Sequence, residues 1–221
     1  MIKDQMNKIY GDMDPDDIPW NIETPPALLQ DLVKSKKLSP CKIIELGCGT
    51  GNYVRYFSKL GFDAAGVDIS DKAIDMAREL AVRDGVQCEF FVADVLGNMS
   101  DIKHKYDIVY DWELLHHIFP EYRNKYMENV HGLIKPTGRY LSVCFSEAST
   151  QFGGVGKYRK TPIGTVLYFT NEAEMETLLG RLFHVEELKS VDVEGKHGVH
   201  KSVYALVKPK TKGAAHAQTS P

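Results

Sequence analysis

A glycine-rich segment in the first quarter of the chain has the residue types and spacing to bind a ligand through its backbone. Residues 43–52 read Ile-Ile-Glu-Leu-Gly-Cys-Gly-Thr-Gly-Asn, with glycines at the alternate positions 47, 49 and 51. Glycine allows a tight turn and a close approach of the backbone to a ligand. Glu45 is a poor neighbour for a pyrophosphate but attracts a positively charged group, and a dinucleotide fingerprint would need glycine or alanine where Asn52 stands. The segment therefore predicts a turn that binds a cationic ligand.

Two more acids follow the next two expected strands. Asp68 ends the segment Gly-Val-Asp-Ile-Ser, which continues with Ile69, and Asp94 follows Phe-Val-Ala and precedes Val95. A carboxylate at position 68 can accept hydrogen bonds from both hydroxyls of an adenosine ribose, and one at position 94 can accept from the adenine amino group. Three carboxylates in register after successive strands predict one site for an adenosine-containing cation.

The elements that must position these residues alternate between strand and helix. Apolar runs predict strands, and apolar residues at helical spacing predict helices between them. The expected strands are residues 42–46, 64–68, 88–92, 106–110, 139–145, 183–193 and 202–208. The expected helices are residues 27–36, 52–60, 71–83, 121–134 and 171–179.

This order predicts an α/β fold with a Rossmann-like, mostly parallel sheet of seven strands and helices on both faces. The last two strands are separated by a glycine-containing turn at 194–198, so they form a terminal antiparallel hairpin. We expect one domain over 1–208, in which 1–36 supplies an N-terminal cap segment and the first helix. Residues 1–24 are expected to be irregular, 147–168 a long loop, and 209–221 a disordered tail.

Composition limits the classes of partner. The 221 residues carry a formal net charge of -3, so no global positive field favours nucleic acid. Neither a signal peptide nor an apolar run long enough for a bilayer is visible, which predicts a cytoplasmic protein without membrane contact. The four cysteines lack zinc-ligand spacing, so we expect reduced thiols and no metal site. Nothing in the sequence specifies an oligomeric state.

At these motifs the chain resembles the class I S-adenosylmethionine-dependent methyltransferases. The resemblance covers the Glu-Leu-Gly-Cys-Gly-Thr-Gly turn, Val-Asp-Ile-Ser, Ala-Asp-Val, the segment at 106–111 and the Leu-Ile-Lys-Pro-Thr-Gly-Arg segment at 133–139. It implies S-adenosyl-L-methionine as cofactor, a methyltransferase activity, and a seven-stranded sheet with a reversed last hairpin.

The N-terminal Ile-Pro-Trp-Asn at 18–21 is similar to the Pro-Trp segment of the thiopurine, thiol and halide branch of small-molecule methyltransferases. The resemblance implies that Trp20 covers the methionine end of the cofactor and that the acceptor is a small molecule. That branch usually has Arg-Gly after the acid of its fourth strand, whereas Asp111 is followed here by Trp112-Glu113, which leaves the acceptor class open. The residues expected to bind the cofactor are Trp20, Glu45, Gly47, Cys48, Gly49, Gly51, Asn52, Asp68, Ile69, Asp94, Val95 and Asp111.

Four residues after the fourth strand are candidates for the chemistry: Asp111, Glu113, His116 and His117. The sulfonium methyl is already activated, so the protein has to align the nucleophile and remove a proton if one is present. Histidine titrates near neutral pH, but neighbouring histidines in a helical stretch point to different faces, so at most one faces the site. An anionic thiolate or halide would need no base. Tyr10 could close over the site.

Three other functions stay open. One is a methyltransferase acting on protein or RNA. Two nucleic-acid motifs are missing from their usual places: no Asn/Asp-Pro-Pro-Tyr/Phe segment, typical of enzymes that methylate exocyclic amines, follows the fourth strand. The Pro40-Cys41 pair precedes the first strand, where its cysteine cannot serve as the usual cytosine nucleophile. Another is a protein that binds S-adenosylmethionine without turnover. A nicotinamide oxidoreductase is disfavoured by Glu45 and Asn52. We also expect residues 1–24 to become ordered when the cofactor binds.

Overall fold

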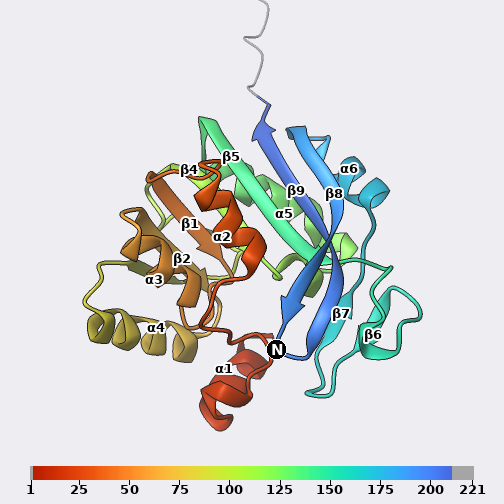
Figure 1. Ribbon diagram of the computed structural model, residues 1–221, viewed down its shortest axis with the longest axis horizontal. Coiled ribbons are helices and arrows are strands. Elements are labelled where there is room, and N and C mark those ends of the chain that lie inside the picture. Colours follow the sequence, from red (N-terminus) through yellow and green to blue (C-terminus); the bar gives the residue numbers. More distant parts are fainter. Residues whose placement is uncertain (1, 211–221) are drawn as a thin grey trace, which may run out of the picture.

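The computed structural model describes residues 2–210, and its centre is a seven-stranded sheet (Figure 1). The strands run in the spatial order β3-β2-β1-β4-β5-β9-β8. The five strands from β3 to β5 are parallel, and β9 is antiparallel to both of its neighbours, β5 and β8. The strands are β1 (Lys42–Leu46), β2 (Asp63–Asp68), β3 (Glu89–Val92), β4 (Tyr106–Trp112), β5 (Ile134–Phe145), β8 (Phe183–Gly195) and β9 (Gly198–Pro209). The predicted fold class is confirmed.

Helices cover both faces of this sheet, with α2 in front and α5 behind in Figure 1. Neighbouring residues of a strand point to opposite faces, so Ile43 packs with one set of helices and Ile44 with the other. The first set is α2 (Ala27–Lys34), α3 (Asn52–Lys59) and α4 (Asp71–Asp84), and the second is α5 (Pro120–Leu133) and α6 (Glu172–Leu179). Among residues 2–210, no helix combines the length and the apolar content that crossing a bilayer requires.

The strand order reverses between β1 and β4, and this reversal decides where a ligand can bind. β1 leads through α3 to β2 on one side, while β4 pairs with the other edge of β1. The loops at the carboxyl ends of β1 and β4 therefore diverge and leave a crevice between them.

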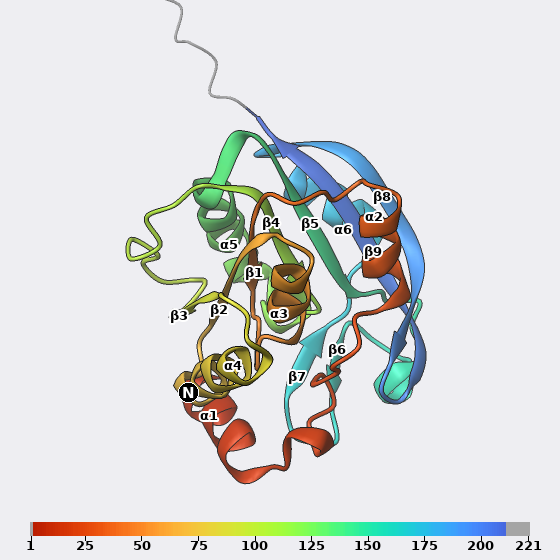
Figure 2. The same cartoon turned by 60° about the vertical axis from the view of Figure 1, so that its left-hand side comes forward.

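The expectation that residues 1–24 are irregular is wrong for residues 2–12, whereas residues 18–24 contain no helix or strand. Ile2–Asp12 form the helix α1, which lies beneath α4 in Figure 2. Its residues Ile9 and Tyr10 are buried in a small core with Ile18 and Ala73. The spacing of Ile2, Met6, Ile9 and Tyr10 is helical, but the helix is short and polar, and this contact with α4 stabilises it.

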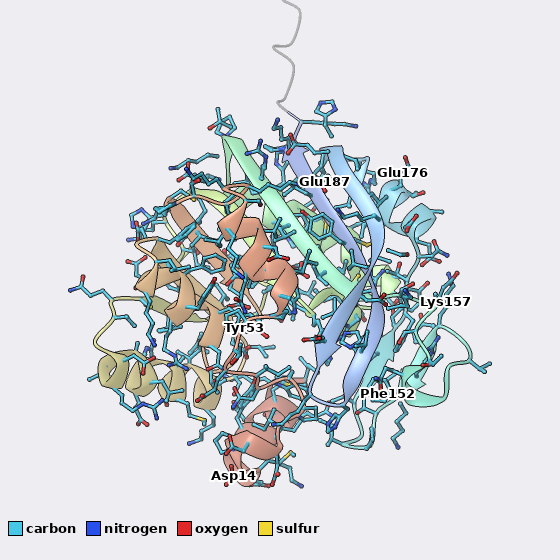
Figure 3. All side chains as sticks on the ribbon, in the orientation of Figure 1. Asp14, Tyr53, Phe152, Lys157, Glu176 and Glu187 are labelled. Atoms are coloured by element: carbon cyan, nitrogen blue, oxygen red, sulfur yellow. The ribbon has the colours of Figure 1, made fainter. Side chains whose placement is uncertain are left out.

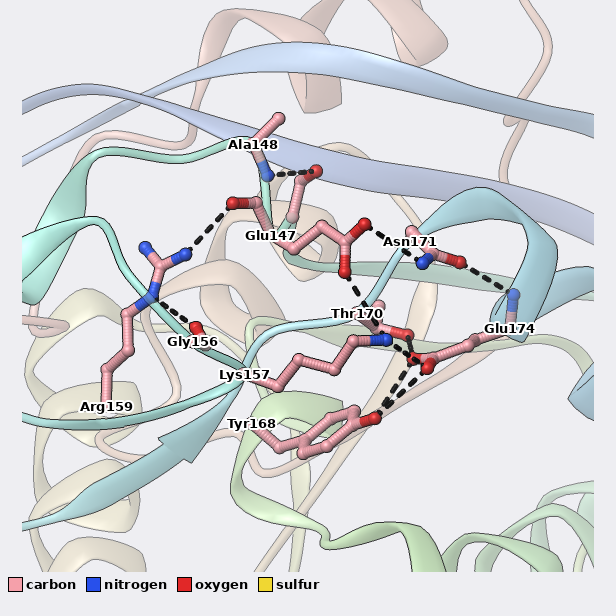
Figure 4. Close-up of polar contacts among 10 residues, drawn as sticks. Glu147, Ala148, Gly156, Lys157, Arg159, Tyr168, Thr170, Asn171 and Glu174 are labelled. Carbon is pink, nitrogen blue, oxygen red and sulfur yellow. Dashed lines mark hydrogen bonds and ion pairs between the residues drawn. The ribbon is translucent and has the colours of Figure 1, made fainter.

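Residues 147–168 are also more regular than expected. They contain a short helical turn at Gln151–Gly153 and a two-stranded hairpin of β6 (Tyr158–Lys160) and β7 (Val166–Tyr168). The guanidinium of Arg159 is buried and donates to the backbone carbonyls of Glu147, Ser149, Gln151 and Gly156, of which Figure 4 shows the first and the last. Lys157 pairs with Glu147 and Glu174 (Figure 4). Both cations therefore hold the loop together.

Smaller differences concern the last third of the chain. β5 begins at Ile134 rather than at residue 139, because α5 leads directly into it. Pro209 belongs to β9, and the Lys210 amide donates to the carbonyl of Leu182, so the expected tail does not begin at residue 209. The remainder of that expectation, 211–221, lies outside the described residues.

Asp111 forms a buried hydrogen-bond network that joins β4, β5 and α5. Its carboxylate accepts from Tyr126 Oη at 2.8 Å, from Ser142 Oγ at 3.0 Å and from Tyr140 Oη. Burial raises the pKa of Asp111 to about 6 in spite of these three donors. Because this pKa is raised in the folded state, ionisation of Asp111 costs stability as the pH rises through about 6, and the hydroxyls limit that cost.

We predict that Tyr126→Phe destabilises the protein by about 1–3 kcal/mol at about pH 8, because a buried carboxylate loses a donor. At about pH 5 the loss should be smaller, because the folded state then holds Asp111 protonated. Urea unfolding at the two pH values measures both. Tyr204→Phe is the control, since the buried Tyr204 hydroxyl has no hydrogen-bond partner within residues 2–210. Equal losses for Tyr126→Phe at both pH values would contradict the ionised network.

A second prediction concerns Gly51, the residue before α3. Its φ is +72°, and a Cβ there would lie 2.6 Å and 2.8 Å from ring atoms of Phe90. Gly61 has a φ of +85° with nothing within 4 Å of such an atom. Gly61→Ala should cost only the left-handed conformation, about 1–2 kcal/mol, and Gly51→Ala about 1–3 kcal/mol more from the clash. Thermal unfolding compares them, and an equal loss would refute the close packing of the turn on β3.

Candidate active site

A cavity of about 810 Å³ opens at the reversal of strand order, over the carboxyl ends of β1, β2 and β4. The turn after β1 forms one wall, and the loop after β4 forms another. The N-terminal segment, the loop after β3, the start of α5 and the turn between β6 and β7 also contribute to the lining. Tyr53, labelled near the middle of Figure 3, lines the cavity from α3.

The glycine turn is held in shape by β2. The amides of Gly47 and Cys48 donate to the carbonyl of Val67 at 2.7 Å and 2.9 Å. The Gly49 amide donates to Asp68 Oδ2 at 2.9 Å, and the Ser70 amide donates to Asp68 Oδ1 at the same distance. Gly47 and Gly49 have positive φ, and a Cβ at Gly47 would lie 2.7 Å from the side chain of Leu114. The turn therefore needs glycine at these positions.

The lining is acidic. Within residues 2–210, it contains neither lysine nor arginine but six carboxylate residues: Glu45, Asp68, Asp94, Glu113, Glu121 and Glu194. Burial raises the pKa of Glu45 well above its ordinary value, although Tyr110 Oη donates to Glu45 Oε2 at 3.0 Å. Burial also raises the pKa of Asp68. A cationic ligand would compensate these buried acids, whereas an anionic one would add to the repulsion.

These features fit a cofactor that carries a sulfonium and an ammonium. The glycines at 47 and 49 let a ligand approach the backbone, and Glu45 supplies a buried acid without a cationic partner among the described residues. Most of the residues expected from the sequence to bind the cofactor line this cavity: Trp20, Glu45, Gly47, Cys48, Gly49, Asn52, Asp68, Ile69, Asp94 and Val95.

Gly51 and Asp111, also expected at the cofactor, do not line the cavity. Gly51 packs against Phe90 instead. β4 extends through Trp112, so Asp111 still lies within the strand, and strand alternation turns its side chain toward α5. The placement of Asp111 at the site was therefore wrong.

The N-terminal segment lies over the turn. Trp20 Nε1 donates to Tyr10 Oη at 2.8 Å, and this hydroxyl lies 2.7 Å from where a Cβ of Gly49 would be. Asn21, which the sequence analysis did not single out as a site residue, accepts from Thr50 Oγ1 at 2.6 Å and from Asn52 Nδ2 at 2.9 Å. Three side chains of the segment therefore cover or clamp the turn.

Of the candidates for the chemistry, Glu113 and His117 line the cavity, and His116 does not. The two histidines belong to a short 3-10 turn, Leu115–His117, and His116 is buried beside the ring of Phe145. Burial lowers the pKa of His117 to about 4, which keeps its ring neutral near pH 7. Sequence analysis missed His200, whose Nε2 lies 2.5 Å from Glu113 Oε1, because no local pattern places β9 beside the loop after β4.

Comparisons with known proteins agree with this geometry. Residues 43–138 match the model of a family described as a methyltransferase domain. The 2-heptyl-1-hydroxyquinolin-4(1H)-one methyltransferase of Mycobacteroides abscessus is 26% identical over 132 residues, which are 59% of this chain and 57% of that protein. The tRNA N(3)-methylcytidine methyltransferase Mettl2 of Drosophila melanogaster is 27% identical over 188 residues, 78% of this chain and 58% of that protein. The chain thus spans less than three fifths of the length of these relatives.

Solved structures share the whole architecture. The structure of Burkholderia thailandensis 1,6-didemethyltoxoflavin-N1-methyltransferase, with bound 1,6-didemethyltoxoflavin and S-adenosylhomocysteine, superposes with a TM-score of 0.73 at 20% identity. The superposition covers 95% of this chain and 88% of that one, and at this identity it is a likeness of fold. Residues 43–138 thus match a methyltransferase domain, and the chain shares the fold of a solved structure that holds S-adenosylhomocysteine, and both findings support S-adenosylmethionine as the cofactor.

Proposed function

We propose that the protein transfers the methyl group of S-adenosylmethionine to a small-molecule acceptor bound in the same cavity. The observation that carries this proposal is a cavity of about 810 Å³ whose lining combines the glycine turn and its buried acids with apolar and aromatic side chains. A cavity of this size is in the range of small-molecule sites.

Each part of the cofactor site has a role in this proposal. The bound cofactor supplies an already activated methyl group. Glu45 attracts the positively charged end, Asp68 accepts from the ribose hydroxyls, and Asp94 accepts from the adenine amino group. Tyr10 and Trp20 exclude water from the covered turn, which strengthens these interactions.

The rest of the cavity suits an apolar or aromatic acceptor. Besides the cofactor turn, the lining includes the apolar or aromatic side chains Leu114, Ile118, Phe119, Tyr122 and Val166. Two similar proteins are named for small ring compounds, a hydroxyquinolinone and a didemethyltoxoflavin, which supports an acceptor of this kind.

A relative named for tRNA supports the alternative of an RNA acceptor. Against it, the cavity lining contains six acidic residues and no lysine or arginine. A phosphodiester backbone next to this lining would be repelled rather than held. The small-molecule acceptor therefore agrees better with the charge of the site.

The experiment that tests the proposal measures S-adenosylhomocysteine release by the purified protein. The acceptor panel contains phenols, hydroxylated heteroaromatics, amines, thiols and halides, with bulk tRNA and protein as comparisons. Turnover on small molecules but not on the polymers is the expected result. Turnover confined to tRNA or protein would refute the acceptor class, and cofactor binding without any turnover would favour a binding protein.

A further prediction concerns Glu45→Gln, which keeps the shape of the side chain and its ability to accept from Tyr110. Affinity for S-adenosylmethionine should fall about tenfold or more, because the buried charge that faces the cation is lost. The unliganded variant should be at least as stable as the wild type near pH 7. Burial raises the pKa of Glu45, so its ionised form costs stability above the ordinary pKa of a glutamate, and glutamine removes that cost.

Titration calorimetry and thermal unfolding measure the two effects of Glu45→Gln. Glu187→Gln is the matched control, because Glu187 lies on β8 in an exposed ion pair with Lys37. It should leave cofactor affinity unchanged. A Glu45→Gln variant that binds as tightly as the wild type would contradict the assigned role.

A further inference from the structure

We infer that Glu113 and His200 act as a pair that takes up a proton from the acceptor, so that the acceptor is an uncharged molecule with an N–H or O–H at its reacting atom. The inference rests on the proposed methyl transfer and specifies its substrate class. Glu113 would be the catalytic residue and His200 the positioning residue.

The backbone at Glu113 is the first observation. Its φ of +62° lies in the left-handed region, which is costly for a residue other than glycine or asparagine. The Glu113 amide donates to the carbonyl of Val143 at 2.7 Å, which holds this conformation directly after β4. The strained residue supplies a carboxylate to the lining of the cavity. A turn with only a structural role would be served better by glycine.

The partner of this carboxylate is the second observation. His200 Nε2 lies 2.5 Å from Glu113 Oε1, and the two side chains are 4% and 17% exposed. The imidazole packs against Phe145, with ring centroids 4.5 Å apart. The buried ring of His200, on β9, therefore lies beside the end of β5. It orients the Glu113 carboxylate, which lines the cavity.

The charge of the cavity is the third observation. Besides Glu113, five other acids line it and no lysine or arginine does, so an anionic nucleophile would be repelled as it approached. An uncharged acceptor avoids this repulsion but must lose a proton when it is methylated. The same acidic lining that disfavours thiolates and halides thus makes a proton acceptor necessary.

The other titratable groups near Glu113 and His200 are poor acceptors for the proton of the substrate near neutral pH. Tyr53 and Cys144 interact with Glu113, and burial raises the pKa of each, so both stay protonated near neutral pH. His116 interacts with His200, and burial lowers its pKa, so its ring stays neutral. His117 is also neutral, and its pKa of about 4 makes it a weak base.

Methyl transfer to the acceptor forms one bond and breaks another. A lone pair of the acceptor nitrogen or oxygen forms the bond to the methyl carbon, and the electron pair of the methyl–sulfur bond passes to sulfur. The acceptor proton passes to the Glu113 carboxylate, whose orientation the His200 ring maintains. The products are the methylated acceptor and S-adenosylhomocysteine, and the proton leaves to solvent from the pair.

The test measures S-adenosylhomocysteine release with two acceptor panels, for wild type, Glu113→Gln, His200→Gln and the control Glu187→Gln. The uncharged panel is phenol, 4-hydroxyquinoline and aniline, and the anionic panel is iodide, hydrosulfide and thiophenolate. We expect wild-type turnover on the uncharged panel, with kcat/KM lowered about 100-fold or more by Glu113→Gln. His200→Gln keeps a donor near the carboxylate and should lose about tenfold or less. Cofactor affinity should stay within about threefold of wild type in both variants.

The pH profile separates a base from a structural residue. Wild-type kcat/KM on phenol should level off well below the pKa of phenol, because the carboxylate then accepts the proton of the neutral acceptor. In Glu113→Gln it should keep rising about tenfold per pH unit, because only acceptor that has ionised in solution then reacts. Parallel profiles for the two proteins, or a loss of cofactor affinity in Glu113→Gln, would overturn the inference. Turnover restricted to the anionic panel would overturn it while leaving methyl transfer intact, and no turnover on either panel would overturn both.

Discussion

The bond between the Gly49 amide and the Asp68 carboxylate is the contact on which the site depends. Asp68 ends β2, and its two oxygens accept from the turn after β1 and from the start of the turn before α4. Tyr10 packs against Gly49 of the turn after β1, and its hydroxyl accepts a hydrogen bond from Trp20 Nε1. One carboxylate therefore fixes the floor of the cavity and, through it, the covering segment.

This arrangement concentrates acids that the fold alone would not favour. Glu45 and Asp68 are buried, burial raises the pKa of each, and the cavity contains no lysine or arginine to compensate them. In a purely structural setting such carboxylates would be liabilities, because a buried charge without a partner costs stability. The proposed binding of a cationic cofactor would account for their presence. The acceptor end differs, since there the partner of Glu113 is the buried side chain of His200.

Much of the fold and of the cofactor site followed from local sequence patterns. The strand and helix periodicities gave the parallel sheet, and the rule that ligands bind at the carboxyl ends of strands brought Glu45, Asp68 and Asp94 to one cavity. Other features depend on contacts between distant segments. The helix α1 is stabilised by packing on α4, and the hairpin of β6 and β7 is closed around the buried Arg159. The error at Asp111 came from two residues of strand length, since a strand that continues to Trp112 turns this side chain away from the cavity.

We propose that the buried acids at the carboxyl ends of the strands bind a positively charged cofactor. Titration calorimetry with S-adenosylhomocysteine, which shares the ammonium, tests it when repeated between about pH 5 and about pH 8 in buffers of different ionisation enthalpy. Because burial raises the pKa of Glu45 in the free protein and a neighbouring cation lowers it, binding should release a proton at the lower pH values and tighten as the pH rises. Binding that is independent of pH and exchanges no protons, or that takes protons up, would contradict the account.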